Sequence, residues 1–206
     1  MKKYSIVIFG GSFNPPLNSH FAIAQQVLNQ YKEVEKVIFV PVNKNYSKAE
    51  LIDNEHRYNM LKLVVNKNNN FMVSDIDFKE DKSLSTIETL EEMKNLFPSK
   101  EIWFLTGSDN LKYFHTWNRA KELVSRYKIL IMERELDIMD DIIQNNELLS
   151  EYKEHFHKLE KSIIGTYSST YVREQVKKGK SIRYLLPDEV WEYIEKNRLY
   201  MEDKDD

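Results

Sequence analysis

The chain has 206 residues with 30 basic and 33 acidic side chains, which gives a formal net charge of -3. This slightly acidic balance argues against a generic nucleic-acid-binding protein, which is usually basic. Hydrophobic residues make up 41% of the chain, enough to bury a core, and the absence of cysteine excludes disulfides, cysteine-zinc sites and thiol nucleophiles.

We expect one domain over residues 1–206, with a small helical C-terminal part at about 165–200 and a frayed tail at 201–206. No stretch approaches the roughly 18 apolar residues that a membrane span needs, and the first apolar run is too short for a signal peptide. We therefore expect a cytoplasmic protein without a nucleic-acid or membrane partner. Self-association into a homo-oligomer stays open.

Short apolar segments recur along the chain and predict strands at residues 5–9, 37–42, 71–76, 101–106 and 128–132. The segments between them have helical periodicity. Ala24, Val27, Leu28 and Tyr31 follow i, i+3, i+4 and i+7, and similar apolar faces occur at 60–65 and 87–97. Alternating strands and helices predict the α/β class: a doubly wound parallel sheet with helices on both faces.

The pattern changes after residue 132. Residues 136–149 read as one helix of weak amphipathicity, and residues 151–162 give no clear prediction. Residues 169–178 and 187–197 predict two closing helices, with Pro187 in a first helical turn, where its missing N–H is not needed.

The loop after the first strand has the composition of a phosphate-binding loop. Gly10 and Gly11 let backbone amides approach a ligand, and a helix N-terminus follows with His20 in its first turn. His20 can donate a hydrogen bond to a phosphate oxygen. The loop is neither a Walker A sequence nor a GxGxxG fingerprint, so the alternative is a tight turn in which His20 only caps the helix.

A second candidate anion site lies near the C-terminus. Ser168, Ser169 and Thr170 stand at a predicted helix start, with Arg173 one turn further along. The alternative is an ordinary helix cap followed by a surface arginine.

The first loop resembles the (His/Thr)-x-x-His signature of the HIGH-type nucleotidyltransferases, a Rossmann-like superfamily. It is most similar to the nicotinate/nicotinamide mononucleotide adenylyltransferase branch, whose bacterial members read Gly-Gly-Thr/Ser-Phe-Asp-Pro-x-His-x-Gly-His. The matching positions are Gly10, Gly11, Ser12, Phe13, Pro15 and His20. Asn14 replaces the usual Asp, and Leu17 stands where the family has a His or Thr that contacts phosphate. Residues 167–173 resemble the family motif Ile-Ser-Ser-Thr-x-Ile-Arg, and residues 184–200 resemble its C-terminal end.

Three further segments carry the resemblance. Gly107 and Asp109 match a Gly-Ala/Ser-Asp motif that is followed by a tryptophan, here Trp117, and the resemblance implies a nucleotide contact for Asp109 and a pyridine-stacking role for Trp117. Thr86 aligns with a residue that contacts the pyridine substituent, and Lys48 with a lysine of a mobile loop. The alternatives are a core residue for Trp117, a helix cap for Thr86, and a solvated lysine for Lys48, with Lys44 as its rival.

The resemblance implies transfer of the adenylyl group of ATP to nicotinate mononucleotide, giving deamido-NAD and pyrophosphate in NAD biosynthesis. His20 and Arg173 would be the catalytic residues. The amides of the first loop (Gly10, Gly11, Ser12, Phe13 and Asn14) and the hydroxyls of Ser168, Ser169 and Thr170 would bind the nucleotide phosphates, together with Lys48, Gly107 and Asp109. Mg²⁺ would bind ATP's phosphate oxygens largely without protein ligands.

Two alternatives stay open. One is a related nucleotidyltransferase with another phosphate acceptor, suggested by the altered loops around Ser47 and Ser85. The other is a non-catalytic nucleotide-binding protein, suggested by Leu17, because leucine cannot donate a hydrogen bond to phosphate.

Overall fold

The structure is a computed structural model that describes residues 4–45, 51–79, 83–133, 138–160 and 167–201. Within these ranges six parallel strands form one sheet in the order β3-β2-β1-β4-β5-β6. The strands are β1 (Ser5–Gly11), β2 (Val34–Pro41), β3 (Phe71–Val73), β4 (Glu101–Gly107), β5 (Lys128–Met132) and β6 (Phe156–Lys158).

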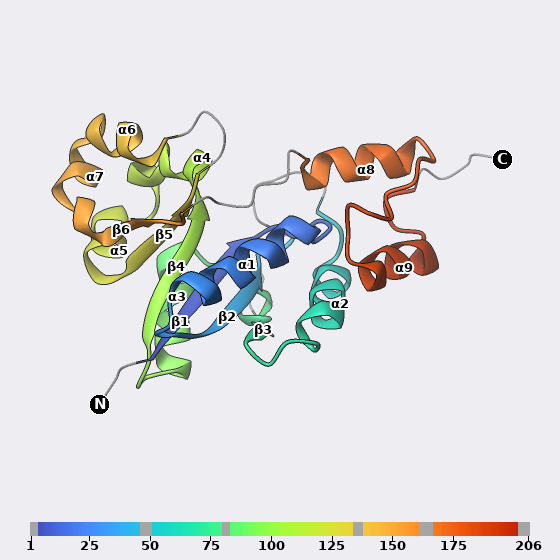
Figure 1. Ribbon diagram of the computed structural model, residues 1–206, viewed down its shortest axis with the longest axis horizontal. Helices are drawn as coiled ribbons and strands as arrows, with labels where there is room; N and C mark the ends of the chain where they lie inside the picture. The colour runs from blue at the N-terminus through green and yellow to red at the C-terminus, as the bar shows by residue number, and fades with distance from the viewer. Residues whose placement is uncertain (1–3, 46–50, 80–82, 134–137, 161–166, 202–206) are drawn as a thin grey trace.

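Helices connect and cover these strands (Figure 1). They are α1 (Asn18–Gln30), α2 (Asn54–Val65), α3 (Thr86–Leu96), α4 (Ser108–Leu111), α5 (Ala120–Arg126), α6 (Met139–Gln144), α7 (Glu147–Glu151), α8 (Ser169–Lys177) and α9 (Asp188–Asn197). In the part of the chain that the structure describes, three 3-10 turns lie between them: η1 (Ile76–Phe78), η2 (Phe114–Thr116) and η3 (Lys153–His155).

The sheet has an apolar core on each face because alternate residues of a strand point to opposite sides. From β1, Ile6 and Ile8 join a cluster with the apolar residues of α3 and α5. Val7 and Phe9 join a second cluster with those of α1 and α2. The expectation of a doubly wound parallel sheet with helices on both faces is therefore confirmed.

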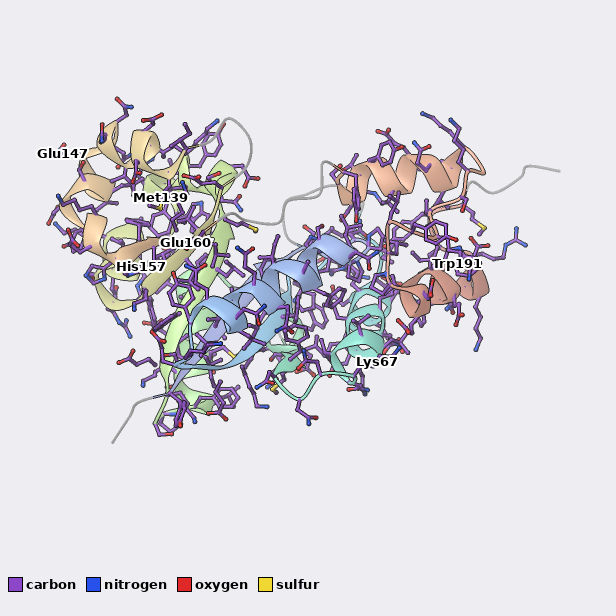
Figure 2. The ribbon with its side chains drawn as sticks, viewed as in Figure 1. Lys67, Met139, Glu147, His157, Glu160 and Trp191 are labelled. Carbon is purple, nitrogen blue, oxygen red and sulfur yellow. The ribbon has the colours of Figure 1, made fainter. Side chains whose placement is uncertain are left out.

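The C-terminal helices pack on a third apolar cluster beside α2 (Figure 1). Leu17 from the first loop and Met60 from α2 contribute to it, together with Val172 of α8 and Val190 and Ile194 of α9. On the surface, Lys67, just after α2, forms an ion pair with Glu189 of α9. Figure 2 shows Lys67 below these two helices and Trp191 on α9.

Two expectations for the region after β5 were wrong or incomplete. The single helix expected over 136–149 is two short helices, because the Asn146 side chain accepts a hydrogen bond from the Leu149 amide at 3.1 Å and so begins α7 anew. Residues 134–137 lie outside the described ranges. The edge strand β6 lies in the segment that gave no prediction, since only Phe156 among its three residues is apolar.

Other boundaries differ by a few residues. β2 begins at Val34 rather than at 37, and β3 ends at Val73, after which Ile76 lies in a 3-10 turn. Pro187 is the N-cap of α9 and not its first helical residue.

The strand order reverses at β1, which pairs with β2 on one side and with β4 on the other. In doubly wound sheets the crevice beyond the carboxyl ends of the strands at this point binds ligands. β1 ends there with Gly10 and Gly11, and β4 ends with Gly107.

Candidate nucleotide-binding site

The first loop has a tight conformation that its sequence explains. A Cβ atom on Gly11 would approach the Phe13 ring to 3.1 Å, so this position has no room for a side chain without a shift of the ring. Phe13 itself has a left-handed backbone with φ of 46° and is buried against Phe9 and Phe39. Aromatic packing thus holds the loop in a backbone conformation that non-glycine residues rarely adopt.

The N-terminal end of α8 lies directly on this loop. Ser169 Oγ donates to the Pro15 carbonyl at 2.8 Å, and Arg173 Nη1 donates to the Asn14 carbonyl at 3.0 Å. Ser168 is the N-cap of α8, and its hydroxyl accepts from the Tyr171 amide at 3.2 Å. Two segments about 155 residues apart in sequence therefore form one structural unit.

Arg57 of α2 supports the same loop from the protein interior. Its side chain is fully buried, and Nη1 donates to the Ser12 carbonyl at 3.0 Å. Its other donors bind the Ile52 carbonyl at 3.1 Å and Asn54 Oδ1 at 2.5 Å. Burial lowers the pKa of Arg57 to about 10, so the guanidinium keeps its charge at neutral pH. No sequence signal distinguished this arginine from a surface residue of an amphipathic helix.

These contacts orient the loop for an anion. The Ser12, Asn14 and Pro15 carbonyls, whose oxygens would repel a phosphate, are all held by protein donors. Because the C=O and N–H of a trans peptide point in opposite directions, the Phe13 amide points away from Arg57. The three carbonyl oxygens are thus bonded within the protein and do not face a ligand as free acceptors.

His20 is fixed through one ring nitrogen. Nδ1 accepts a hydrogen bond from the Leu17 amide at 2.9 Å, which is the capping contact of α1, and the ring packs edge-on against Phe13. In the neutral ring the proton is therefore assigned to Nε2, which becomes the donor. His20 thus caps the helix, as the alternative interpretation of the loop expected. Its second ring nitrogen, Nε2, is a hydrogen-bond donor.

Leu17 has a packing role. Its side chain is only 2% exposed and belongs to the cluster under α8 and α9. The residue that appeared to be a missing phosphate ligand joins the first loop to the C-terminal helices.

A pocket of about 270 Å³ opens beside the loop at the carboxyl edge of the sheet. It brings together Gly10, Gly11, Ser12, Thr86 and Trp117, which the sequence had singled out from three separate segments. Ser85, noted in the sequence as part of an altered loop, also lines the pocket. Further lining residues with polar side chains, which sequence reasoning missed, are Asp77, Thr89, Thr106, Asn110 and Asn118.

The far wall of the pocket combines an aromatic ring with a helix start. Trp117 is partly buried and stacks on Phe114, with ring centroids 4.9 Å apart. Thr86 is the first residue of α3, and Ser85 is its N-cap, so the alternative that Thr86 caps the helix was wrong by one position. Asn118 Nδ2 donates to Ser85 Oγ at 3.2 Å and links the two sides of this wall.

Asp77 is a buried carboxylate that joins three segments around the pocket. It accepts hydrogen bonds from the Asn43 amide at 2.7 Å, the Leu84 amide at 2.5 Å and the Ser83 hydroxyl at 3.0 Å. Burial raises the pKa of Asp77, while these donors act in the opposite direction. Its effect is to hold the loop after β2 against the start of α3. A single aspartate in a short turn gave no sequence signal for this role.

Three further candidates either are not among the residues that line the pocket or lie outside the described residues. Gly107 and Asp109 stand at the end of β4 and in α4, where Thr106 and Asn110 line the pocket instead. Lys48 lies in the segment 46–50, which is outside the described ranges. Its rival Lys44 is exposed and pairs with Asp53 at 2.9 Å, a contact that lowers the pKa of that carboxyl.

In the described ranges no group of three or more His, Asp or Glu side chains could hold a metal ion. None of the helices in those ranges is long and apolar enough to cross a membrane.

Comparison with known proteins decides the family. A model of the Cytidylyltransferase-like family matches residues 8–175. The chain is 35% identical over 197 residues to the probable nicotinate-nucleotide adenylyltransferase of Lachnoclostridium phytofermentans, covering 94% of this chain and 98% of the relative. The corresponding protein of Carboxydothermus hydrogenoformans is 35% identical over 198 residues, covering 95% and 97%. The chain belongs to the nicotinate-nucleotide adenylyltransferase family, a family of nucleotidyltransferase enzymes.

The fold of this family extends to distant members. The Plasmodium falciparum nicotinic acid mononucleotide adenylyltransferase, solved in complex with NaAD, matches with a TM-score of 0.79 at 21% identity and covers 96% of this chain and 97% of that chain. This match confirms the Rossmann-like fold. The family model and the curated relatives confirm the resemblance stated from the loop and the Ser-Ser-Thr motif.

Proposed function

We propose that the chain transfers the adenylyl group of ATP to nicotinate mononucleotide, giving deamido-NAD and pyrophosphate. The observation that carries this proposal is the seating of α8 on the first loop through Ser169 and Arg173. This contact supports the proposal because it joins the two candidate anion-binding elements beside a pocket that could take a flat polar ring. Family membership supports the same reaction.

The proposed chemistry needs no enzyme nucleophile. A phosphate oxygen of the mononucleotide attacks the α-phosphorus of ATP, a new O–P bond forms, and the bond to the β-phosphate oxygen breaks to release pyrophosphate. Catalysis then comes from positioning and charge stabilisation. His20 donates from Nε2 to the α-phosphate, where negative charge develops.

The remaining polar groups of the two elements bind the triphosphate. Loop amides of Gly10 to Phe13 and the hydroxyls at the start of α8 cradle the phosphate oxygens. Arg173 offsets charge on the leaving pyrophosphate while it stays bonded to the Asn14 carbonyl. Asn14 itself contributes to the loop geometry, and we retain Lys48, Gly107 and Asp109 as proposed contacts on the nucleotide side.

The acceptor occupies the pocket. Trp117 stacks on the pyridine ring, and the start of α3 at Thr86 offers donors for its carboxylate. A carboxylate suits a helix N-terminus better than a carboxamide does, which favours nicotinate over nicotinamide mononucleotide.

Mg²⁺ would accompany ATP, with the phosphate oxygens of the nucleotide as its ligands. The described residues contain no cluster of acidic and histidine side chains that could hold the ion alone. When bound, the ion supplies charge neutralisation on the triphosphate. We propose that the protein recognises the phosphate groups around it through Arg173 and the loop amides.

The test is pyrophosphate release from ATP with Mg²⁺ and either nicotinate or nicotinamide mononucleotide. The proposal predicts turnover with the nicotinate form and a higher kcat/KM for it than for the nicotinamide form. Folded protein that releases no pyrophosphate with either acceptor would overturn the proposal.

A further inference from the structure

The end of the chain returns to the first loop. Tyr200, three residues after α9, donates its hydroxyl to Asn14 Oδ1 at 2.9 Å. Asn14 is only 2% exposed, and the contact joins residues 186 positions apart. Tyr200 has a left-handed backbone with φ of 62°, as does Arg198 with φ of 54°, and these conformations turn the chain back from α9. The hydrogen bond from Tyr200 therefore fixes the Asn14 side chain in one orientation.

The surroundings keep the tyrosine hydroxyl protonated. Burial raises the pKa of Tyr200 well above its usual range, against smaller opposite effects of Arg173 and Arg57. The phenol thus stays a hydrogen-bond donor, and its acceptor is the Asn14 side-chain oxygen. Arg173 meanwhile binds the backbone carbonyl of the same residue at 3.0 Å.

We propose that Tyr200 is a positioning residue, whose hydroxyl holds the Asn14 side chain and through it fixes the first loop for the triphosphate. The proposal rests on the proposed function of that loop. In this proposed role Tyr200 does not touch the substrate and acts only through Asn14. It acts together with Arg57, which fixes the Ser12 carbonyl two residues earlier in the loop.

The test compares Tyr200→Phe with Tyr193→Phe as a matched control. Tyr193 is also a partly buried tyrosine of the C-terminal part, but its hydroxyl contacts His56 at 3.0 Å and Asn59 at 3.4 Å in α2, away from the loop. We expect Tyr200→Phe to lower kcat/KM for ATP about 10-fold and to weaken binding of α,β-methylene ATP, with Tm within a few degrees of the wild type. Tyr193→Phe should change kcat/KM less than about 2-fold.

A double-mutant cycle asks whether the effect passes through Asn14. When Asn14→Ala is already present, adding Tyr200→Phe should lower kcat/KM by a further factor of less than about 2. An undiminished 10-fold loss in that background would overturn the proposal, as would a Tyr200→Phe enzyme equal to the wild type.

Two further measurements keep the proposal testable. If Tyr200→Phe does not fold, Asn14→Asp keeps an acceptor for the hydroxyl and should retain kcat/KM within about 3-fold, whereas Asn14→Leu should lose about 10-fold. Equal values for the two would overturn the proposal. The affinity for α,β-methylene ATP, measured by calorimetry, reports on the loop geometry without turnover. A wild-type protein that is inactive on nicotinate mononucleotide would therefore refute the proposed function but not the role of Tyr200. Equal affinities of the wild type and Tyr200→Phe for this analogue would refute the role of Tyr200.

Discussion

At the scale of single residues, His20 is the side chain whose two ring nitrogens have separate tasks. Nδ1 accepts from the Leu17 amide, and Nε2 is assigned to the substrate. We predict that His20→Ala lowers kcat by about 10²–10³-fold, the cost of removing one donor from developing charge. The lost cap should cost only about 1 kcal/mol of stability.

Steady-state pyrophosphate release and urea unfolding measure these two effects separately. Gln25→Ala, on the exposed side of the same helix, is the control and should leave kcat unchanged. A His20→Ala enzyme with kcat within about 3-fold of the wild type would contradict the assigned role.

Leu17 provides a second prediction at this scale. Leu17→His would restore the residue type that the family signature has at this position, yet the side chain is 2% exposed within an apolar cluster. An imidazole there has to be buried without the packing of leucine, so we predict a loss of about 2–4 kcal/mol of stability and no gain in activity. Denaturant unfolding and the same activity assay check this. A more active variant of unchanged stability would show instead that Leu17 limits catalysis.

Whether a residue of the candidate site could be predicted from the sequence depends on how close its interaction partners are in sequence. Gly10 to His20 and Ser168 to Arg173 could be predicted, because a helix start with hydroxyls or glycines has a local signature. Arg57, Asp77 and Tyr200 could not, because each acts on a distant segment. Their importance appears only once the chain has folded.

At the scale of elements, an ion-pair network fixes the segment that carries Trp117. Arg119, whose backbone is left-handed with φ of 52°, precedes α5 and binds Glu91 of α3 through Nη2 at 2.8 Å. Arg126 binds the same carboxylate at 2.7 Å. The hydrogen bonds from Arg119, followed by those from Arg126, lower the pKa of Glu91 to about 2.

The sign of the pH dependence follows from this depressed pKa. A carboxylate with a lower pKa in the folded state stabilises the fold above its unfolded pKa of about 4.5, and this contribution is lost as the pH falls towards 2. We predict that Glu91→Gln lowers Tm at pH 6 and that its difference from the wild type shrinks at pH 3. High salt should shrink the difference as well, because the network is partly exposed. The same Tm difference at both pH values would contradict this prediction.

The elements themselves were largely predictable up to β5, where long apolar strands alternate with amphipathic helices. Between β5 and the two closing helices α8 and α9, which were also predicted, the elements are short. The asparagine that begins α7 and the three residues of β6 are set by local capping and by pairing with Ile129 to Ile131. A hydrophobic period needs more residues than these elements have.

At the scale of the whole molecule, one apolar cluster connects the sheet part with the C-terminal helices. The first loop contributes Leu17 and α2 contributes Met60. The C-terminal helices contribute Val172 from α8 and Val190 and Ile194 from α9. We propose that the chain is one domain, as its length indicates. Thermal unfolding should then give a single transition, with equal midpoints by far-UV circular dichroism and tryptophan fluorescence. A separate early transition of the C-terminal part, seen by Trp191 fluorescence in a protein with its other tryptophans replaced by phenylalanine, would contradict this.

The proposed adenylyl transfer depends most on the convergence of the first loop and α8 on a single triphosphate. A crystal structure of the chain with α,β-methylene ATP and Mg²⁺ tests this directly. We predict that His20 Nε2 and the Arg173 guanidinium lie within about 2.7–3.2 Å of phosphate oxygens of the same nucleotide. A triphosphate bound to only one of the two elements, or held elsewhere on the molecule, would contradict it.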